Sequence, residues 1–369
     1  MKIAITGLSA VKYGAIVYLK NLIFYLSKAD RINEYHIFVH KNYPPDWMVS
    51  QRNFIYQKCP FYTKFVLFRF LWEQFILPVK LKKYKIDLLF TAKNMNILLA
   101  NCKTVISIAN MEPLCYENYS NHWRLNIASW MRKLLTIVSI KKANKVIAPS
   151  NATKAYLESI LPDVREKVEV IYNGNPLDKT LFKPNTPNEA SPFLLSASKF
   201  VAYANQLNLI EGYALLNRTS GNVPQLWLAG GILDKVYYKK VQKAIARNNL
   251  TKKVKILGMV PHEELVNLYS KASGFVFPST LEVCPHTLIE AMACGVPMAV
   301  SKIEPMPEVC ENAAIYFDPF DKYDIAEKIR VILTDLETRE RLKEASIKRS
   351  VFFDWTKIAD RLVKVFEEV

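Results

Sequence analysis

The segment from residue 274 to residue 301 constrains the fold more than any other part of the chain. Residues 274–277 form an apolar run that predicts a buried strand. A helix is expected to begin near Pro285, because proline suits a first helical position. It should stop at Gly295, where glycine can adopt the left-handed conformation. A second strand is expected over residues 298–301, so the segment predicts a strand–helix–strand unit.

Two carboxylates, Glu282 and Glu290, lie in this unit and are separated by seven residues. The expected boundaries place Glu282 in the loop after the first strand and Glu290 about two turns along the helix. Ligands of open α/β sheets bind outside the carboxyl ends of the strands. The two glutamates are therefore candidate ligand-binding residues.

The rest of the chain repeats this alternation of short apolar strands and amphipathic stretches in two series. Such an alternation predicts parallel, doubly wound α/β sheets. The polar stretch 185–192, which contains prolines, is typical of a linker. We therefore expect an N-terminal domain over residues 1–185, a second domain over 186–352 and a final helix over 353–369. The other expected strands are 2–6, 35–39, 87–90, 104–108, 145–148, 193–196, 225–229 and 254–257, with a helix over 15–27.

Charge is distributed unevenly between the two halves. Residues 1–185 hold 27 Lys and Arg against 12 Asp and Glu, an excess of 15 out of the chain's total of +16. A strongly basic half can meet nucleic acid, an anionic bilayer or a phosphorylated substrate. No helix-turn-helix, zinc or RNA-binding pattern supports nucleic acid. The N-terminus lacks the pattern of a signal peptide, no run of about 18 apolar residues is present, and the six cysteines show no CxxC spacing. A cytoplasmic protein with reduced thiols is expected.

The segment around the two glutamates follows the pattern P-S-x-x-E-x7-E-A-M-A-x-G-x-P, with P-E some residues later. In this it resembles the donor-sugar signature of retaining glycosyltransferases of family 4. The resemblance implies the GT-B fold, in which two Rossmann-like domains face each other across a cleft and the last helix returns to the first domain. It also implies sugar transfer from a nucleotide sugar in the synthesis of bacterial lipopolysaccharide or another surface glycan. The residues that carry it are Pro278, Ser279, Glu282, Glu290, Ala291, Met292, Ala293, Gly295, Pro297, Pro307 and Glu308, with support from 145–150, 170–174 and 254–261.

The resemblance also assigns roles on the donor side. It implies that Glu290 binds the ribose hydroxyls, that Glu282 binds the sugar hydroxyls, and that the backbone near Met259 holds the base of a UDP- or GDP-type donor. The N-terminus of the helix can offer N–H groups and a partial positive charge to the diphosphate. The family's Gly-Phe-Gly is replaced here by Val283-Cys284-Pro285, so proline removes one donor. The loop and first-turn residues expected at the diphosphate are Val283, Cys284, His286 and Thr287.

A cationic clamp on the diphosphate is the largest departure from the family. Relatives have Arg and, five residues on, Lys followed by Asn; this chain has Lys199, Ala204 and Asn205. Lysine keeps the charge of arginine but loses its bidentate fork, and alanine removes the charge. Three interpretations stay open: a natural variant with a substitute cation, a protein disabled on purpose, or an enzyme that has lost activity. We favour the second, because everything around Ala204 fits the active pattern.

The first domain offers weaker candidates. Gly7 and Gly14 frame a loop similar to the one beneath the donor sugar in the family, although a plain turn explains them as well. Asn110 could bind a sugar hydroxyl or form a structural turn. Among the histidines, only His286 is a candidate ligand; the expectation for His36, His40, His122 and His262 is a structural or solvent-facing position.

The expected reaction uses no cofactor or metal, since no Asp-x-Asp and no His/Cys/Asp cluster with metal spacing is present. By resemblance the anomeric configuration is retained. No protein nucleophile is apparent, so a front-face route, in which the leaving phosphate takes the acceptor's proton, fits best. Alternatives are a disabled nucleotide-sugar-binding protein or another GT-B enzyme such as a phosphorylase or an epimerase.

The acceptor is expected to be a lipid-linked or phosphorylated glycan at the inner face of the cytoplasmic membrane. Segments 61–85 and 123–145 interleave aromatic, aliphatic and basic residues, as interfacial helices do. Core helices with snorkelling lysines are the alternative. The two interpretations are balanced for the first segment, and a core position is favoured for the second.

Overall fold

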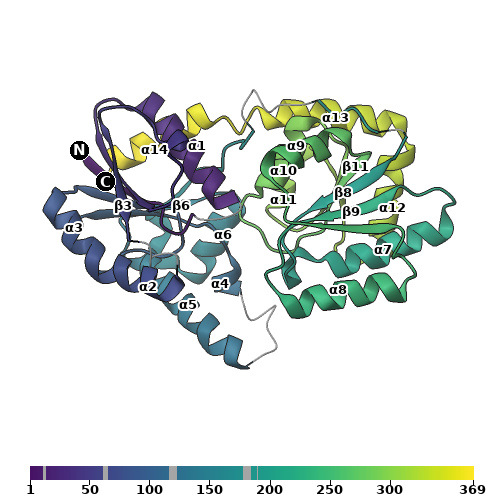
Figure 1. The fold of residues 1–369 in the computed structure, drawn as a ribbon, viewed down its shortest axis with the longest axis horizontal. Helices are drawn as coiled ribbons and strands as arrows, with labels where there is room; N and C mark the ends of the chain where they lie inside the picture. The colour runs from purple at the N-terminus through teal and green to yellow at the C-terminus, as the bar shows by residue number, and fades with distance from the viewer. Residues whose placement is uncertain (11–13, 61–64, 116–122, 178–183, 189) are drawn as a thin grey trace. The chain divides into compact units, whose positions relative to one another are not determined.

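The computed structural model describes residues 1–10, 14–60, 65–115, 123–177, 184–188 and 190–369. The chain divides into two compact units, residues 1–174 with 354–369, and residues 175–353. Each unit is a parallel α/β sheet covered by helices (Figure 1), which confirms the predicted fold class.

Unit 1 has seven parallel strands in the order β3-β2-β1-β4-β5-β6-β7. Its order reverses between β1 and β4, where Thr6 and Thr91 are register partners. The residues of the central strands are nearly all buried, as expected of a parallel sheet with helices on both faces. The strands are β1 (Lys2–Thr6), β2 (Glu34–His40), β3 (Phe54–Cys59), β4 (Leu88–Thr91), β5 (Lys103–Ser107), β6 (Lys145–Ala148) and β7 (Val168–Val170).

Alternate residues of these strands enter two separate cores. Ile3 and Ile5 pack with α1 (Gly14–Ala29) and with α14 (Trp355–Glu367), which comes from the far end of the chain. Ala4 packs on the opposite face, with residues of the π-helical turn η3 (Trp72–Ile76) and of α3 (Leu77–Tyr84). The preceding helix α2 (Val66–Leu71) has no buried residue. The remaining helical elements of unit 1 are η1 (Pro45–Trp47), α4 (Glu112–Cys115), α5 (Trp123–Lys142), α6 (Asn151–Ile160) and η5 (Pro162–Lys167).

The favoured core position of segment 123–145 is wrong for one face of α5. Ile127, Trp130, Met131 and Leu134 are between 44% and 56% exposed. The helix turns Thr136 and Ser139 inward instead, with exposures of 1% each. Polar residues thus fill part of the buried side of α5, while apolar ones face solvent.

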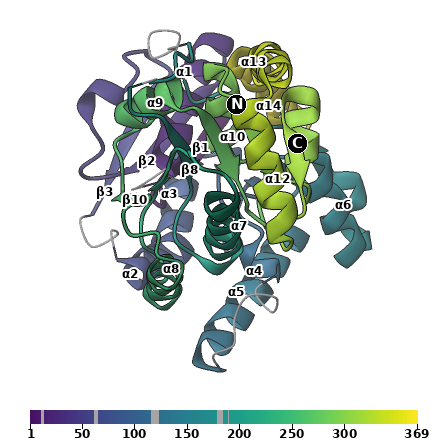
Figure 2. The ribbon, with the colours of Figure 1, turned by 90° about the vertical axis from the view of Figure 1, so that its right-hand side faces the viewer.

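Unit 2 has six parallel strands in the order β10-β9-β8-β11-β12-β13. Helices α7 and α12 pack side by side on one face of the sheet (Figure 2). The strands are β8 (Phe193–Ala197), β9 (Gln225–Ala229), β10 (Val254–Gly258), β11 (Gly274–Phe277), β12 (Met298–Ser301) and β13 (Ile315–Phe317). The helical elements are η6 (Ala202–Ala204), α7 (Gln206–Thr219), α8 (Lys235–Arg247), α9 (His262–Lys271), α10 (His286–Cys294), α11 (Met306–Cys310), η7 (Glu311–Ala313), α12 (Lys322–Thr334) and α13 (Leu336–Ser350).

The boundary between the units follows Gly174 rather than Asn185. Asn185 is buried, and its side-chain amide donates to the backbone oxygens of Tyr269 (2.9 Å) and Ala272 (3.0 Å) at the end of α9. Because these bonds tie Asn185 to unit 2, the polar stretch that begins there is not a free linker.

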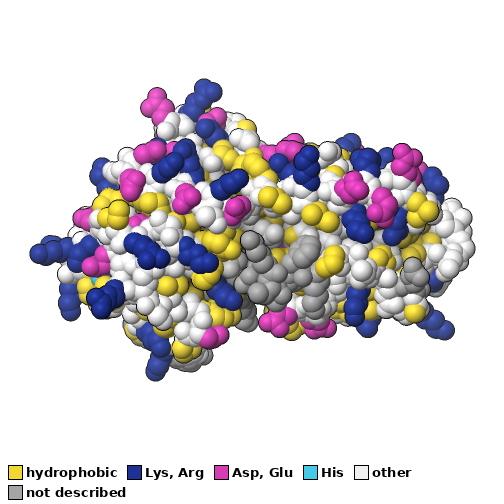
Figure 3. Space-filling view, turned by 90° about the horizontal axis from the view of Figure 1, so that it is seen from above, with side chains coloured by type: hydrophobic (Ala, Val, Ile, Leu, Met, Phe, Trp, Pro, Cys, Tyr) yellow, Lys and Arg dark blue, Asp and Glu magenta, His cyan; other side chains and the backbone are white. Residues whose placement is uncertain are grey.

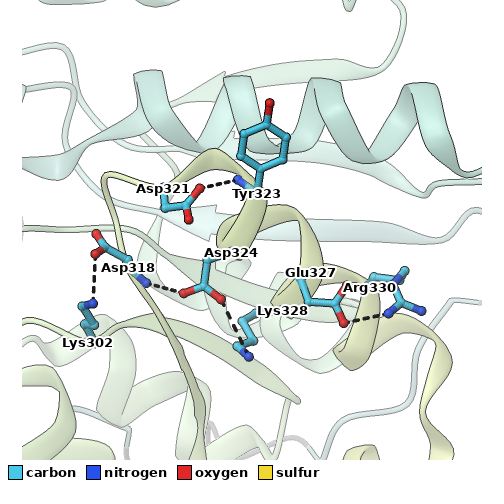
Figure 4. Close-up of polar contacts among 8 residues, drawn as sticks. All are labelled: Lys302, Asp318, Asp321, Tyr323, Asp324, Glu327, Lys328 and Arg330. Atoms are coloured by element: carbon cyan, nitrogen blue, oxygen red, sulfur yellow. Dashed lines mark hydrogen bonds and ion pairs between the residues drawn. The ribbon is translucent and has the colours of Figure 1, made fainter.

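A set of acidic side chains fixes the turn from β13 to α12 (Figure 4). Asp321 caps α12 by accepting from the Tyr323 N–H at 2.8 Å. Asp324 accepts from the Asp318 N–H at 2.7 Å, and Lys302 lies 2.9 Å from the Asp318 carboxylate. The hydrogen bond from Lys302 lowers the pKa of Asp318. These contacts position the turn that contains Pro319.

Candidate functional site

The loop between β11 and α10 holds Glu282 in a partly buried position. Its Oε1 accepts a hydrogen bond of 2.9 Å from the Ser279 hydroxyl. Burial raises the pKa of Glu282, although the charge of Lys199 and the hydrogen bond from Ser279 act in the opposite direction. A carboxylate whose pKa is raised by burial, next to a lysine, is a candidate functional residue.

Glu290 is held by two donors from α9. Its Oε1 lies 2.8 Å from His262 Nε2, and its Oε2 accepts from the Tyr269 hydroxyl at 3.0 Å. Burial, followed by the Glu290 charge, raises the pKa of Tyr269 well above its usual value. Each carboxylate oxygen can accept a further bond, so Glu290 is oriented by the protein and still able to bind a ligand.

His262 is the residue that sequence reasoning missed. It was expected to be structural or solvent-facing, but it touches a candidate ligand-binding carboxylate. A signal was present in the sequence, because His262 and Tyr269 are seven residues apart and therefore lie on one face of a helix. Only the packing of α9 against α10 shows that this face meets Glu290.

The expected cationic clamp occupies the segment between β8 and α7. The Lys199 ammonium lies 5.3 Å from the centre of the Tyr203 ring, and its charge acts on Glu282. Ala204 ends the short helix η6 and is only 1% exposed. Lys199 is therefore placed beside Glu282, whereas position 204 carries no charge and faces the interior.

Asn205 has a structural role in addition to its expected one. It adopts the left-handed conformation with φ of 59°, and its side-chain amide donates to the oxygens of Pro278 (3.2 Å) and Pro319 (2.7 Å). These bonds connect the loop after β11, which carries Glu282, with the turn after β13. The side-chain nitrogen of Asn205 therefore holds the loop and the turn together.

The N-terminus of α10 follows directly from this loop. Pro285 is the N-cap residue rather than the first residue of the helix, and its oxygen accepts from Leu288 N at 3.2 Å. The N–H groups of His286 and Thr287 lie in the first turn, where helical N–H groups lack an intrahelical acceptor. Val283 and Cys284 are buried residues of the loop itself, while His286 and Thr287 are partly exposed. Backbone groups, not a side-chain cation, thus form the electropositive part of this loop.

Met259, the residue expected near the base, directly follows β10. Its side chain is 64% exposed, and Gly258 before it has a φ of 70°. The left-handed glycine turns the chain at the end of β10, and the exposed Met259 follows this turn.

The three candidates of the first domain belong to unit 1. Gly7 follows β1, and a Cβ at this position would lie 2.3 Å from Leu19 Cδ2, so any larger residue would force the Leu19 side chain to shift. Gly14 is the first residue of α1. Asn110 accepts from Glu112 N at 2.9 Å, which is the structural turn considered for it. His122 and residues 11–13 of the glycine-bearing loop lie outside the described residues. The structure therefore brings candidates of unit 2 together, whereas among the described residues it shows no such convergence of Gly7, Gly14 and Asn110.

Comparison with known proteins agrees with this geometry. The model for glycosyl transferases group 1 matches residues 178–349, and the model for Glycosyltransferase Family 4 matches residues 13–179. The chain belongs to glycosyltransferase family 4.

Relatives and solved structures extend the comparison. The O-antigen chain mannosyltransferase B of Escherichia coli is 28% identical over 197 residues, which are 50% of this chain and 51% of that protein. The phosphatidylinositol N-acetylglucosaminyltransferase GPI3 subunit of Saccharomyces cerevisiae is 25% identical over 268 residues, 69% of this chain and 57% of that protein. The matches thus span little more than half the length of these relatives.

Two solved structures share the fold along the whole chain. Sucrose-phosphate synthase from Thermosynechococcus elongatus superposes with a TM-score of 0.77 at 20% identity, covering 100% of this chain and 98% of that one. Anabaena HepE, solved in complex with UDP and glucose, gives a TM-score of 0.74 at 20% identity and 100% coverage of both chains. The GT-B fold predicted from the sequence is confirmed.

Proposed function

We propose that this family 4 glycosyltransferase transfers a sugar from a nucleoside-diphosphate sugar to a glycan hydroxyl. The observation that carries the proposal is the pair of carboxylates in unit 2. Glu290 is held by His262 and Tyr269, and Glu282 lies beside Lys199 at the end of β11. A UDP- or GDP-type donor would place its ribose at Glu290, its sugar at Glu282 and its diphosphate at the first turn of α10. Binding of UDP to the fold neighbour HepE and the mannosyltransferase relatives support this class of donor.

The transfer is proposed to retain the anomeric configuration without a metal ion. Negative charge grows on the diphosphate as the glycosidic bond breaks, and N–H groups at the start of α10 can stabilise it. In the front-face route, the acceptor oxygen bonds to the anomeric carbon while the leaving phosphate oxygen takes the acceptor's proton. Determining the anomeric configuration of the product by NMR tests this route, and an inverted product would exclude it.

Calorimetry with UDP, GDP and ADP tests the donor site without knowledge of the acceptor. One nucleotide is expected to bind clearly more tightly than the others, because the base contacts are selective. If none of the three binds to the folded protein, the proposed function is wrong. Binding without transfer to any of a broad panel of acceptors would favour the alternative of a disabled sugar-nucleotide-binding protein.

A lipid-linked acceptor is supported by exposed apolar residues in unit 1. Val66, Leu67 and Phe68 of α2 are between 53% and 71% exposed, and Val79 of α3 is 67% exposed. Three lysines, Lys80, Lys82 and Lys83, occur in the same α3 segment. Apolar residues flanked by lysines suit the interface of an anionic membrane. No helix among the described residues is long and apolar enough to cross a bilayer.

Other parts of the surface are less suited to a membrane. On the face drawn in Figure 3, Lys and Arg side chains are interspersed with Asp and Glu. Such mixed charge gives little net attraction to anionic lipid. The proposal is therefore confined to the surface formed by α2, α3 and the outer face of α5.

Vesicle sedimentation tests peripheral binding. The protein is expected to bind vesicles that contain phosphatidylglycerol, and to bind less as salt rises, because screening weakens attraction between exposed charges. Replacing Leu67 and Phe68 by glutamate should abolish binding. Phe320→Glu in unit 2, at a residue that is 69% exposed, is the matched control. Equal binding by both variants, or binding that ignores salt, contradicts a membrane role for this surface.

A further inference from the structure

A second set of polar side chains lies at the carboxyl ends of β1 and β4, in unit 1. Glu73 is buried, with a side chain that is 4% exposed, and its Oε2 lies 2.5 Å from the Lys93 ammonium, whose side chain is 16% exposed. The Thr6 hydroxyl is 3.4 Å from Glu73 Oε1. The ion pair therefore lies just inside the surface, with the lysine at its outer side.

The topology of unit 1 makes this position a natural ligand site. The strand order reverses between β1 and β4, so these two strands flank the switch point of the sheet. Ligands of open α/β sheets bind outside the carboxyl ends of the strands at such a point. Thr6 is the last residue of β1, and Lys93 lies two residues after the end of β4.

Thr91 adds a polar group that no protein contact satisfies. Its hydroxyl is buried and has no hydrogen-bond partner among the residues that the structure describes. Thr91 is the register partner of Thr6, and partners in neighbouring parallel strands direct their side chains to the same face. The Thr91 hydroxyl thus lies on the face of the sheet that carries Thr6 and Glu73.

Glu73 comes from a local distortion of the helix. It belongs to the π-helical turn η3, in which Trp72, Glu73 and Gln74 are all buried. Gln74 is used structurally, because its amide donates to Asn96 O at 3.0 Å and accepts from Leu98 N at 2.9 Å. π-Helical turns occur frequently at functional sites, and a buried ion pair is a poor way to gain stability compared with apolar packing. Stability alone therefore does not explain why Glu73 and Lys93 are present.

We propose that Thr6, Glu73, Thr91 and Lys93 form a subsite for the hydroxyl groups of a neutral sugar. A sugar hydroxyl both donates and accepts, and this set supplies a carboxylate acceptor, an ammonium donor and two hydroxyls that do either. The charges of Glu73 and Lys93 cancel, which suits an uncharged ligand. Identification of that sugar as the end of the acceptor glycan rests on the proposed transferase function.

Saturation-transfer NMR with the methyl glycosides of mannose, galactose and N-acetylglucosamine tests the subsite in the full chain. At least one of the three is expected to receive saturation from the wild-type protein. Thr91→Val, which keeps the shape and removes the hydroxyl, should weaken its binding at least fivefold without lowering the melting temperature. The double variant E73L/K93M, which replaces the ion pair by apolar groups, should abolish binding.

Two controls locate the signal. Asp163→Asn changes an exposed ion pair with Lys141 elsewhere in unit 1 and should leave binding unchanged. Glu282→Gln changes the proposed donor site of unit 2. The saturation signal that is lost in Thr91→Val should still be present in this variant. The proposal is overturned if no glycoside binds the wild-type protein, or if both T91V and E73L/K93M bind like it. Failure of the donor function is a separate result, because it appears as absent nucleotide binding in calorimetry.

Discussion

Replacement of Glu290 by glutamine tests the donor site most directly. The side chain is 6% exposed, and its two oxygens face His262 Nε2 at 2.8 Å and the Tyr269 hydroxyl at 3.0 Å. A glutamine fits the same volume. Its oxygen can accept from Tyr269 while its NH2 group donates to a neutral His262 that has changed tautomer. The fold should therefore survive E290Q, whereas the negative charge offered to the ribose is lost.

The expected loss of affinity follows from the hydrogen bonds at stake. Hydrogen bonds to charged groups contribute about 1.5–3 kcal/mol, against about 1 kcal/mol for neutral ones. Exchanging the carboxylate for an amide should therefore cost about 1 kcal/mol for each of two ribose hydroxyls, which gives about 2 kcal/mol of nucleotide binding or roughly 30-fold in Kd. Glu290→Leu should in addition leave the buried Tyr269 hydroxyl without its acceptor. A further cost of about 2 kcal/mol in unfolding free energy should lower the melting temperature by about 6 °C.

Calorimetry with the nucleotide that the wild-type protein prefers measures the first effect, and thermal unfolding measures the second. Glu327→Gln is the matched control, because it makes the same chemical change on exposed α12, where Glu327 pairs with Arg330 (Figure 4). If folded E290Q binds the nucleotide within twofold of the wild-type protein, Glu290 does not hold the ribose and the donor assignment of α10 is wrong.

The remaining predictions concern the clamp, the loop and the unit boundary. Ala204→Lys should raise turnover with the proper donor about a hundredfold, corresponding to about 3 kcal/mol, whereas Ala204→Met, of similar length, should not; no gain in rate from the lysine would refute the alignment. Burial raises the pKa of Glu282 above its usual 4.5, so the native state binds the carboxyl proton of Glu282 more tightly than the unfolded state does. Loss of that proton therefore lowers the stability of the native state as pH rises from about 4.5 through the higher folded-state pKa. Glu282→Gln should therefore be more stable than wild type at pH 7.5, with a difference that shrinks as pH falls to 4.5, and a pH-independent difference in melting temperature would contradict this sign. Gly174→Ala would place a Cβ 2.4 Å from the Trp355 ring, so denaturant unfolding should show a loss of about 1–3 kcal/mol.

Most strands could be predicted from the sequence, whereas three strands at the edges of the sheets could not. The buried central strands form continuous apolar runs, and those are readily found. The strands that were not predicted, β3, β7 and β13, all lie at the edges of their sheets. Edge strands are covered less completely, and in β3 only Phe54 and Cys59, at its two ends, are buried. The strands β7 and β13 have only three residues each. Their hydrophobic signal is correspondingly weak.

The sequence predicts candidate residues for a donor site, but it does not predict the contacts that hold those residues in place. Glu282 and Glu290 stand in a recognisable local pattern, since the loop and helix that carry them are contiguous in sequence. Asn205 bonds to oxygens 73 and 114 residues away, and no local pattern encodes such contacts. The role of Ala204 also remains a prediction, because its burial does not tell whether another cation serves the diphosphate.

The last helix has a consequence for how proteins of this kind can be recombined. Residues 354–369 complete the core of unit 1, to which α14 contributes Trp355, Leu362 and Phe366. A fragment that ends at Gly174 contains every strand of the sheet of unit 1. It would nevertheless expose the surfaces of α1 and of the sheet that α14 covers in the full chain. A chimera made with one junction would join the α14 of one parent to the sheet of another. Exchange of donor specificity between relatives therefore requires two junctions, near residues 174 and 353, so that α14 is inherited with the first 174 residues rather than with its neighbours in sequence.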